Sequence, residues 1–151
     1  MISTFLFYSK FTEEGVSRYS DTGGNPVFRF FTEVGNQAHR HYQGLSGECR
    51  VAEFPLANGK ADCMKASTPR CEVIEVKANN GKSISRGRRE AKEYAIELNK
   101  LGADFKKLVA QDSGFKDCKE FVPRVACYVA QASVTDDGTV QISSLGWGWC
   151  D

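Results

Sequence analysis

The sequence predicts a single α+β domain with a mixed central β-sheet flanked by helices, in the order helix, three strands, helix, strand. Three observations lead to this prediction. A helical apolar period appears twice, three short strand-like runs stand between the two helical patterns, and turn residues separate all of them. A chain of 151 residues fits one domain, so we expect a single domain over residues 1–151 with its core at about 26–133.

The first predicted elements are a strand at Ile2–Tyr8 and, after a Gly-rich loop, a helix from Pro26 to about Gln43. Asn25 precedes Pro26 as an N-cap would, and proline favours the first helical position. Apolar residues then recur at helical spacing, although the first turn alone would also suit a strand. Three short strands follow, bounded by an Asn-Gly turn and by prolines: Cys49–Phe54, Lys60–Ala66 and Cys71–Lys77.

A second helix begins after a cap at Ser83 or Ser85 and continues to about Leu101. A short helix is expected at Asp104–Ala110. The remaining elements are a hairpin around Asp136-Asp137-Gly138 and an aromatic tail that we expect to pack: Val122–Ser133, Thr139–Ser143 and Trp147–Cys150.

Composition and charge restrict the classes of function. The 41% hydrophobic and 26% charged residues are ordinary for a globular protein. The formal net charge is +1, so the protein as a whole would not be drawn to nucleic acid or to an anionic membrane. No apolar run approaches the length needed to span a bilayer. We therefore expect no membrane partner, and any affinity for nucleic acid must come from a local patch.

Six cysteines permit three disulfides in fifteen connectivities. None lies in a Cys-x-x-Cys pair and only two histidines are present, so a zinc site is not expected. We expect all six to be reduced, because Cys63, Cys71 and Cys127 lie in predicted strands, where free cysteine is a common buried residue. The alternative is a disulfide-stapled secreted binding domain without catalysis.

Two charges end the third predicted strand. Because alternate residues of a strand share a face, Glu75 and Lys77 point one way while Ile74 and Val76 point the other. Charges at the end of a buried strand are costly unless they are paired or bind an ion. Three other acidic-x-Lys matches occur, but only this one has an acid, Asp62, on the preceding predicted strand.

Asp62 and Glu75 together predict a metal site. Two carboxylates on adjacent strands repel each other unless a cation lies between them, and an all-oxygen set selects Mg²⁺ or Mn²⁺ over zinc. The carbonyl of Val76 could supply a third oxygen.

These residues resemble a known family. A helix, then a strand, turn and strand with Asp-x12-Glu-x-Lys, then a capped helix, resembles the PD-(D/E)XK or restriction-endonuclease-like nucleases over Pro26–Leu101 and Val122–Ser133. Within this superfamily, Gly59–Asp62, Cys71–Lys77 and Arg88–Tyr94 look most like the nuclease domains of bacterial polymorphic and type VI secretion toxins.

The resemblance implies roles for particular residues. Asp62 and Glu75 would hold Mg²⁺, and Lys77 would orient or deprotonate the attacking water and stabilise charge on the phosphate. Glu33 on the first helix resembles the acid that holds a metal-bound water in many members, although it could equally be a solvated helix residue. Several relatives carry Gln-x-x-x-Tyr on the second helix; here Glu90 replaces the Gln, and packing is the simpler role for Tyr94.

A basic cluster follows the motif strand. We interpret it as a phosphate-binding patch, with a helix surface carrying Arg86–Glu90 and Arg89–Glu93 pairs as the alternative. Nuclease chemistry assisted by histidine would involve His39 and His41. These residues are two apart and so do not share a helix face, and we expect each to be packed or solvated. The cluster consists of Lys82, Arg86, Arg88, Arg89 and Lys92.

The resemblance implies a Mg²⁺-dependent nuclease that hydrolyses DNA as an antibacterial toxin, with Mn²⁺ able to substitute. Such a toxin would be secreted by a bacterial secretion system, act in the recipient cytoplasm, and have a cognate immunity protein and a larger carrier or secretion-system component as partners. A housekeeping nuclease of the same fold, for repair, junction resolution or restriction, is the alternative enzyme.

Overall fold

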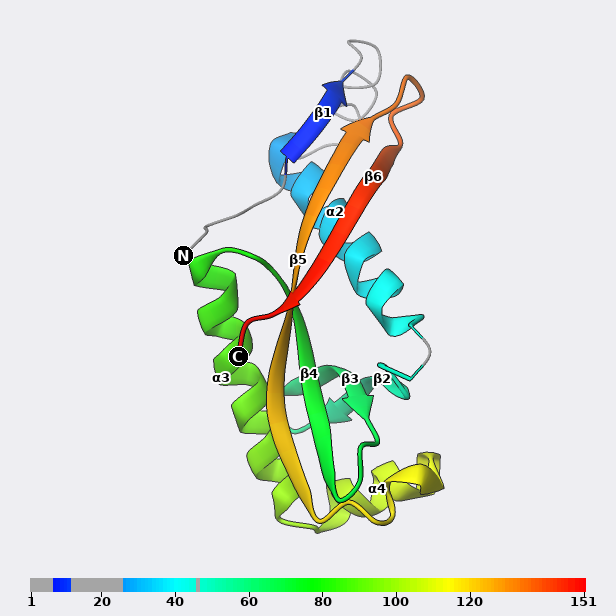
Figure 1. Cartoon of the computed structure of the whole chain (residues 1–151), viewed down its shortest axis with the longest axis vertical. Coiled ribbons are helices and arrows are strands. Elements are labelled where there is room, and N and C mark those ends of the chain that lie inside the picture. Colours follow the sequence, from blue (N-terminus) through cyan, green and yellow to red (C-terminus); the bar gives the residue numbers. More distant parts are fainter. Residues whose placement is uncertain (1–6, 12–25, 46) are drawn as a thin grey trace.

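The computed structural model describes residues 7–11, 26–45 and 47–151. Over these residues the chain forms a six-stranded sheet in the order β1-β5-β4-β3-β2, with β6 on β5 (Figure 1). The strands are β1 (Phe7–Phe11), β2 (Val51–Leu56), β3 (Gly59–Lys65), β4 (Arg70–Ala78), β5 (Glu120–Val134) and β6 (Val140–Trp149). The helices are α2 (Pro26–Gln43), α3 (Gly81–Asn99) and α4 (Ala103–Gln111), followed by the 3₁₀ turn η1 (Ser113–Phe115). The predicted fold class and element order are confirmed.

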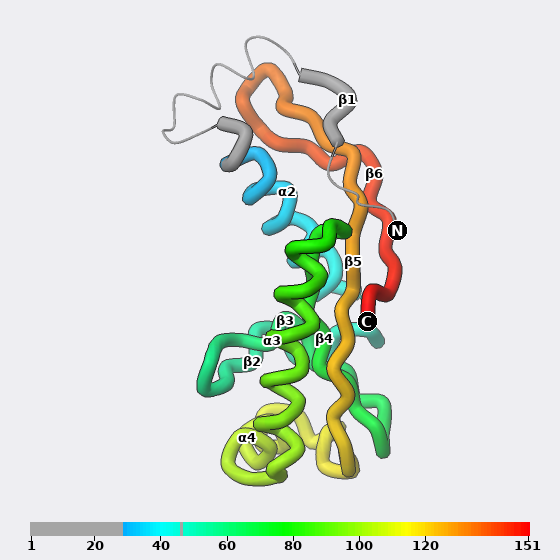
Figure 2. The backbone as a smooth tube through the Cα atoms, turned by 90° about the vertical axis from the view of Figure 1, so that its left-hand side faces the viewer, coloured from blue at the N-terminus to red at the C-terminus, as the bar shows by residue number. Residues whose placement is uncertain are grey.

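The sheet is mixed. Strands β2, β3 and β4 are successively antiparallel, whereas β4 and β1 both run parallel to β5, and β5 and β6 form a hairpin. The 15-residue strand β5 extends along the length of the molecule, with α3 beside its lower part and α2 beside its upper part (Figures 1 and 2).

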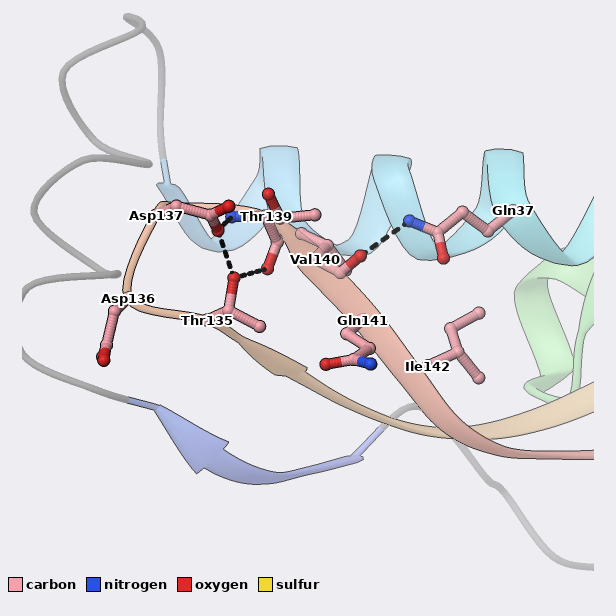
Figure 3. Close-up of a pocket in the computed structure, with 8 residues that line it drawn as sticks. All are labelled: Gln37, Thr135, Asp136, Asp137, Thr139, Val140, Gln141 and Ile142. Carbon is pink, nitrogen blue, oxygen red and sulfur yellow. Dashed lines mark hydrogen bonds between the residues drawn. The ribbon is translucent and has the colours of Figure 1, made fainter.

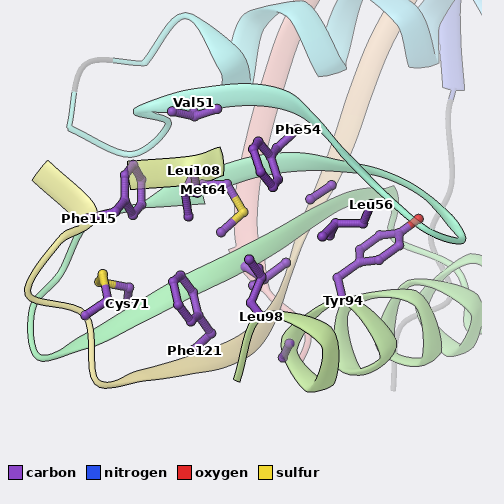
Figure 4. Packing of buried hydrophobic residues seen from close by; sticks show 14 residues of the cluster. Val51, Phe54, Leu56, Met64, Cys71, Tyr94, Leu98, Leu108, Phe115 and Phe121 are labelled. Atoms are coloured by element: carbon purple, nitrogen blue, oxygen red, sulfur yellow. A yellow bond between two sulfur atoms is a disulfide. The ribbon is translucent and has the colours of Figure 1, made fainter. Parts of the chain in front are cut away.

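The two long helices cover opposite faces of β4. Ile74 and Val76 pack in one hydrophobic cluster with Val34 of α2. Val73, on the other face, packs in a second cluster with residues of α3 and α4, among them Leu98 (Figure 4). Alternation along one strand therefore separates an α2 side from an α3 side.

Several boundaries differ from those that the sequence predicts. Pro55 lies inside β2, which an edge strand tolerates because one side of its backbone needs no partner. The side chain of Asn80, rather than Ser83 or Ser85, caps α3 by accepting the Ser83 N–H at 2.9 Å. The aromatic tail continues the hairpin as β6 up to Trp149. Of the strand expected at Ile2–Tyr8, residues 2–6 lie outside the described residues.

The expectation of six reduced cysteines is wrong. Three disulfides join Cys49 to Cys63, Cys71 to Cys118, and Cys127 to Cys150. The Cα–Cα distances of 5.1, 5.7 and 6.0 Å lie in the range that disulfides adopt. Each bond joins residues that only the folded chain brings together, so the spacing of the cysteines in the sequence did not reveal the pairing.

The turn between β5 and β6 borders a pocket of about 680 Å³ (Figure 3). The Thr135 hydroxyl donates to Asp137 and to the Thr139 carbonyl, and Gln37 of α2 donates to the Val140 carbonyl at 2.9 Å. The Thr135 bonds lie within the turn, and the Gln37 bond joins the start of β6 to α2. None of the predicted site residues is in the lining: Gln37, Thr135, Asp136, Asp137, Thr139, Val140, Gln141 and Ile142.

Candidate active site

The β3–β4 ladder ends where two acidic residues meet. The last registered pair is Cys63 with Ile74. At the next position the Asp62 N–H donates to Glu75 Oε2 at 2.9 Å, and the Val76 N–H donates to Asp62 Oδ2 at 2.8 Å. Carboxylates thus replace main-chain acceptors, and each acid is fixed by the backbone of the opposite strand. The sequence-predicted pair is brought together here.

Glu75 is buried, with 2% of its surface exposed. Burial raises its pKa to about 8, and the charge of Asp62 adds to this rise, while the Asp62 N–H and Lys77 act in the opposite direction. The local positive charge is therefore too weak to keep the carboxylate at its ordinary pKa, as expected of a site that would accept a further cation.

Lys77 lies beside this pair on the α3 side. Its Nζ is 3.0 Å from Glu90 Oε1, and Arg86 Nε is 3.1 Å from the same oxygen. The stem of Lys77 crosses α3 at Gly87, where a Cβ would lie 2.7 Å from Lys77 Cγ. A glycine at this point of the helix therefore leaves the space that the lysine side chain occupies.

Tyr94 belongs to the α3-side core, as the packing interpretation predicts (Figure 4). Its hydroxyl lies so close to Gly59 that a side chain at that position would collide with it. Burial raises the pKa of Tyr94 to about 12, with further contributions from the carboxylates of Glu75, Glu90 and Asp62. Tyr94 thus has one end in the core and the other near the acidic groups.

His39 reaches the site from α2. Its Nε2 is 3.2 Å from Asp62 Oδ2, and its Nδ1 is 2.8 Å from the Gly35 carbonyl oxygen. Burial lowers the pKa of His39, but the hydrogen bond and charge of Asp62, with the Gly35 carbonyl, leave the pKa raised overall. The sequence-based expectation of a packed or solvated histidine did not include this contact with Asp62. The spacing of His39 and His41 shows only whether two residues of one helix share a face, and it does not indicate which strand residue the helix contacts.

The structure does not bring Glu33 to this pair. Its Oε1 accepts from Gln37 Nε2 at 3.1 Å and lies 3.5 Å from Arg40 Nη2, both on the same helix. Six residues separate Glu33 from His39, which corresponds to about 120° around an α-helix. A role for Glu33 in holding water stays a prediction.

The five basic residues of α3 divide into two groups. Arg86 is paired with Glu90, and Arg88 donates to the carbonyls of Cys150 and Asp151 at 2.9 and 3.0 Å. The other three are exposed and make no hydrogen bond or ion pair within the described part of the chain: Lys82, Arg89 and Lys92.

The donor set fits Mg²⁺ or Mn²⁺. Asp62 Oδ1 and Glu75 Oε1 accept no hydrogen bond from any described residue, so each acid keeps one oxygen for a ligand. Among residues 7–11, 26–45 and 47–151, no three His, Cys, Asp or Glu side chains form a ready-made metal cluster. Mg²⁺ commonly binds through only one or two carboxylates, with water and substrate phosphate as its other ligands. A contribution from the Val76 carbonyl stays a prediction.

One family model covers more than half of the chain. The family described as Restriction endonuclease fold toxin 9 matches residues 29–113, which are more than half of the chain and include Asp62, Glu75 and Lys77. Comparisons with curated proteins and with solved structures found no match. No helix in the described residues is long and apolar enough to cross a membrane. The chain therefore belongs to the restriction endonuclease fold toxin 9 family and is a toxin nuclease of the restriction-endonuclease-like fold.

Proposed function

We propose that this toxin is a Mg²⁺-dependent nuclease that hydrolyses phosphodiester bonds in DNA and acts as an antibacterial effector. One observation carries the proposal: Asp62 and Glu75 are fixed face to face at the end of the β3–β4 ladder, with the Lys77 ammonium beside them. A structural role alone would not require the buried carboxylate of Glu75 to face a second acid at a site that raises its pKa.

Each group has a distinct task in the proposed reaction. Asp62 and Glu75 would hold Mg²⁺, for which Mn²⁺ can substitute, and the bound cation would supply Lewis-acid stabilisation of phosphate charge and make water a better nucleophile. Lys77 orients the attacking water and stabilises the charge that develops on the phosphate, a kind of contribution worth on the order of 10² to 10³ in rate. Glu90 fixes the Lys77 ammonium at 3.0 Å.

The DNA backbone lies along α3 in this proposal. Lys82, Arg89 and Lys92 are exposed on the helix that also carries Glu90, and phosphate contacts provide most of the affinity of sequence-independent DNA binding. The rest of the surface contributes little because the net charge is only +1.

The match to a toxin family supports the biological setting that we propose. A DNA-cleaving effector requires a cognate immunity protein in the producing cell, and we propose a larger carrier or secretion-system component for delivery to a recipient cytoplasm. The three disulfides are consistent with passage through an oxidising compartment. A housekeeping nuclease remains the alternative role; only a toxin should kill bacteria when produced without its immunity protein.

The proposal is tested by incubating the oxidised protein with plasmid DNA, with and without Mg²⁺, beside Asp62→Ala, Glu75→Ala and Lys77→Ala. We expect cleavage only with the metal, and a loss of at least about 100-fold in each variant. The matched controls are Asp117→Ala and Lys119→Ala, from an exposed acidic-x-Lys sequence, and these should cut like the parent.

Equal cutting by the parent and the three site variants would refute this site. Cleavage of RNA but not of DNA, measured in parallel, would keep the site and change the substrate. Absence of cleavage of either nucleic acid by a folded parent would instead favour the disulfide-stapled binding domain without catalysis.

A further inference from the structure

Two residues of α2 contact Asp62, and a third, one turn earlier, contacts one of these two. Gly35, His39 and Gln43 lie on one face of the helix because a four-residue step is close to one turn. His39 Nε2 contacts the Asp62 carboxylate at 3.2 Å, and Gln43 Nε2 donates to the Asp62 main-chain carbonyl at 3.2 Å. The same helix face therefore contacts both the side chain and the backbone of Asp62.

Gly35 determines which way the imidazole points. Its carbonyl can only accept a hydrogen bond, so the contact at 2.8 Å makes His39 Nδ1 the donor. With Nδ1 held there, Nε2 faces Asp62, and because the carboxylate oxygen only accepts, the ring donates from both nitrogens in this contact. The orientation of His39 is thus fixed from the helix side and not by Asp62 alone.

We infer that His39 is a positioning residue of the proposed nuclease site, which holds the Asp62 carboxylate so that Oδ1 is available to a divalent cation. This inference rests on the proposed function. Asp62 Oδ2 is contacted both by the Val76 N–H at 2.8 Å and by His39 Nε2 at 3.2 Å, and two contacts at one oxygen restrict rotation of the carboxylate. Partners of this kind orient metal ligands in many metal sites.

The contacts favour positioning over direct coordination. The Nε2 of His39 already lies within contact distance of a carboxylate oxygen of Asp62. The side chain of His39 is 33% exposed, while Val34, Ala38 and Tyr42 supply the buried contacts of α2. Removing the imidazole should therefore leave the core intact.

The test measures Mn²⁺ affinity by the electron paramagnetic resonance signal of the free ion, on oxidised full chain. The variants are His39→Ala, His39→Gln and, as a matched control on the same helix, His41→Ala. Because loss of a residue that hydrogen-bonds to a metal ligand typically weakens metal binding about 10- to 100-fold, we expect a loss of that size for His39→Ala. His39→Gln, whose amide N–H can replace Nε2, should stay within a few-fold of the parent. His41 is exposed and stacks on Trp147, so its variant should bind like the parent.

Cleavage kinetics give a second readout. His39 contacts Asp62 and no predicted phosphate-binding residue, so His39→Ala at limiting Mg²⁺ should lower kcat and leave KM for DNA unchanged. His39→Asn keeps a polar group but is too short to reproduce the Nε2 contact. It should behave like His39→Ala and replaces it if the alanine variant fails to fold by circular dichroism.

Two results would overturn the inference. Parent-like Mn²⁺ affinity in both His39→Ala and His39→Asn would mean that His39 does not position Asp62. An equal loss in His39→Gln and His39→Ala, at unchanged Tm, would mean that the imidazole itself is needed as a ligand. A parent that neither binds Mn²⁺ nor cuts nucleic acid would refute the proposed function instead, and Glu75→Ala serves as the reference for complete loss of the site.

Discussion

Glu72 and Glu75 lie on the same strand, β4, yet have opposite surroundings. Glu72 Oε1 accepts from Arg124 Nη1 at 3.0 Å, and the Arg124 guanidinium also contacts Asp151 and lies 3.8 Å from the centre of the Trp149 ring. Glu75 faces Asp62, a second acid, on the α3 side. On one face of the strand an arginine neutralises the acid. On the other face the nearby positive charge is too weak to offset the burial of Glu75 and the charge of Asp62.

This difference shows what distinguishes a structural acid from a site acid in this fold. Both residues are largely shielded from solvent, Glu75 more completely than Glu72. Their partners also differ: an arginine from β5 balances the charge of Glu72, whereas Glu75 faces a second acid and could be balanced by a cation from outside the chain. Each prediction below tests this comparison.

The largest expected effect concerns the disulfide that anchors the α3 side of β4. Cys71, on the Glu75 face, is bonded to Cys118 across a separation of 47 residues. The loop-entropy relation predicts that the double variant Cys71→Ser/Cys118→Ser loses about 4 kcal/mol of unfolding free energy. The disulfide between Cys49 and Cys63 closes a shorter separation of 14 residues, and the variant Cys49→Ser/Cys63→Ser should lose about 3 kcal/mol. Urea unfolding measures both. The order of the two losses is the critical result, and a reversed order would show that loop length does not govern stability here.

The second prediction exchanges one carboxylate oxygen for an amide in each acid. Glu75→Gln keeps an acceptor for the Asp62 N–H but loses the charge, so DNA cleavage should fall at least about 100-fold, or ~2.7 kcal/mol, without loss of stability. Glu72→Gln should do the opposite. It weakens a charged hydrogen bond to Arg124, at a cost of about 1–3 kcal/mol in unfolding free energy, with cleavage nearly unchanged.

Cleavage assays and urea unfolding on the same two preparations would check this exchange. If Glu72→Gln lost cleavage as severely as Glu75→Gln while remaining folded, the distinction between the two faces of β4 would fail. If Glu75→Gln strongly lowered the free energy of unfolding, the ionised carboxylate of Glu75 would itself contribute to the stability of the fold.

The sequence predicts the part of this comparison that depends on local spacing. The short connection between β3 and β4, at residues 66–69, and the period of the strands bring Asp62 opposite Glu75, because neighbouring antiparallel strands have a defined register. Arg124 pairs with Glu72 across 52 positions in the sequence, a relation that no local pattern encodes. The same holds for the disulfides and for the contact of His39 with Asp62, since the angle at which a helix crosses a strand is set by side-chain packing.

The third prediction is a dependence of stability on pH. Without divalent ions the pKa of Glu75 is about 8 in the folded protein, above its ordinary value of 4.5. Between these values the folded state keeps a proton that the unfolded state has released. The stabilisation is therefore fully present below pH 4.5 and is lost as the pH rises through 8, by up to about 1.4 kcal/mol per pH unit. The raised pKa of His39 acts in the same direction.

Urea unfolding at intervals between about pH 5 and 8 measures this slope. Glu75→Gln should flatten it, and Mg²⁺ should reduce it because the cation stabilises the ionised carboxylate. Glu72→Gln serves as the control and should retain the slope of the parent. A slope that persisted unchanged in Glu75→Gln would assign the effect to other groups.

The smallest expected effect extends the comparison to α3, where Arg88 and Arg89 are neighbours with different partners. Arg88 donates to the carbonyls of Cys150 and Asp151, whereas Arg89 is exposed and has no hydrogen-bond partner among the described residues. If only uncompensated charges contact phosphate, Arg89→Ala should reduce the slope of log affinity against log salt by about 0.9, and Arg88→Ala should leave it nearly unchanged. Fluorescence anisotropy with labelled duplex DNA, in the inactive Glu75→Gln background, measures both slopes. Equal slopes in the two variants would mean that Arg88 releases the carbonyls of Cys150 and Asp151 when DNA binds. The hydrogen-bond partners of an arginine in the free protein would then not determine whether it contacts phosphate.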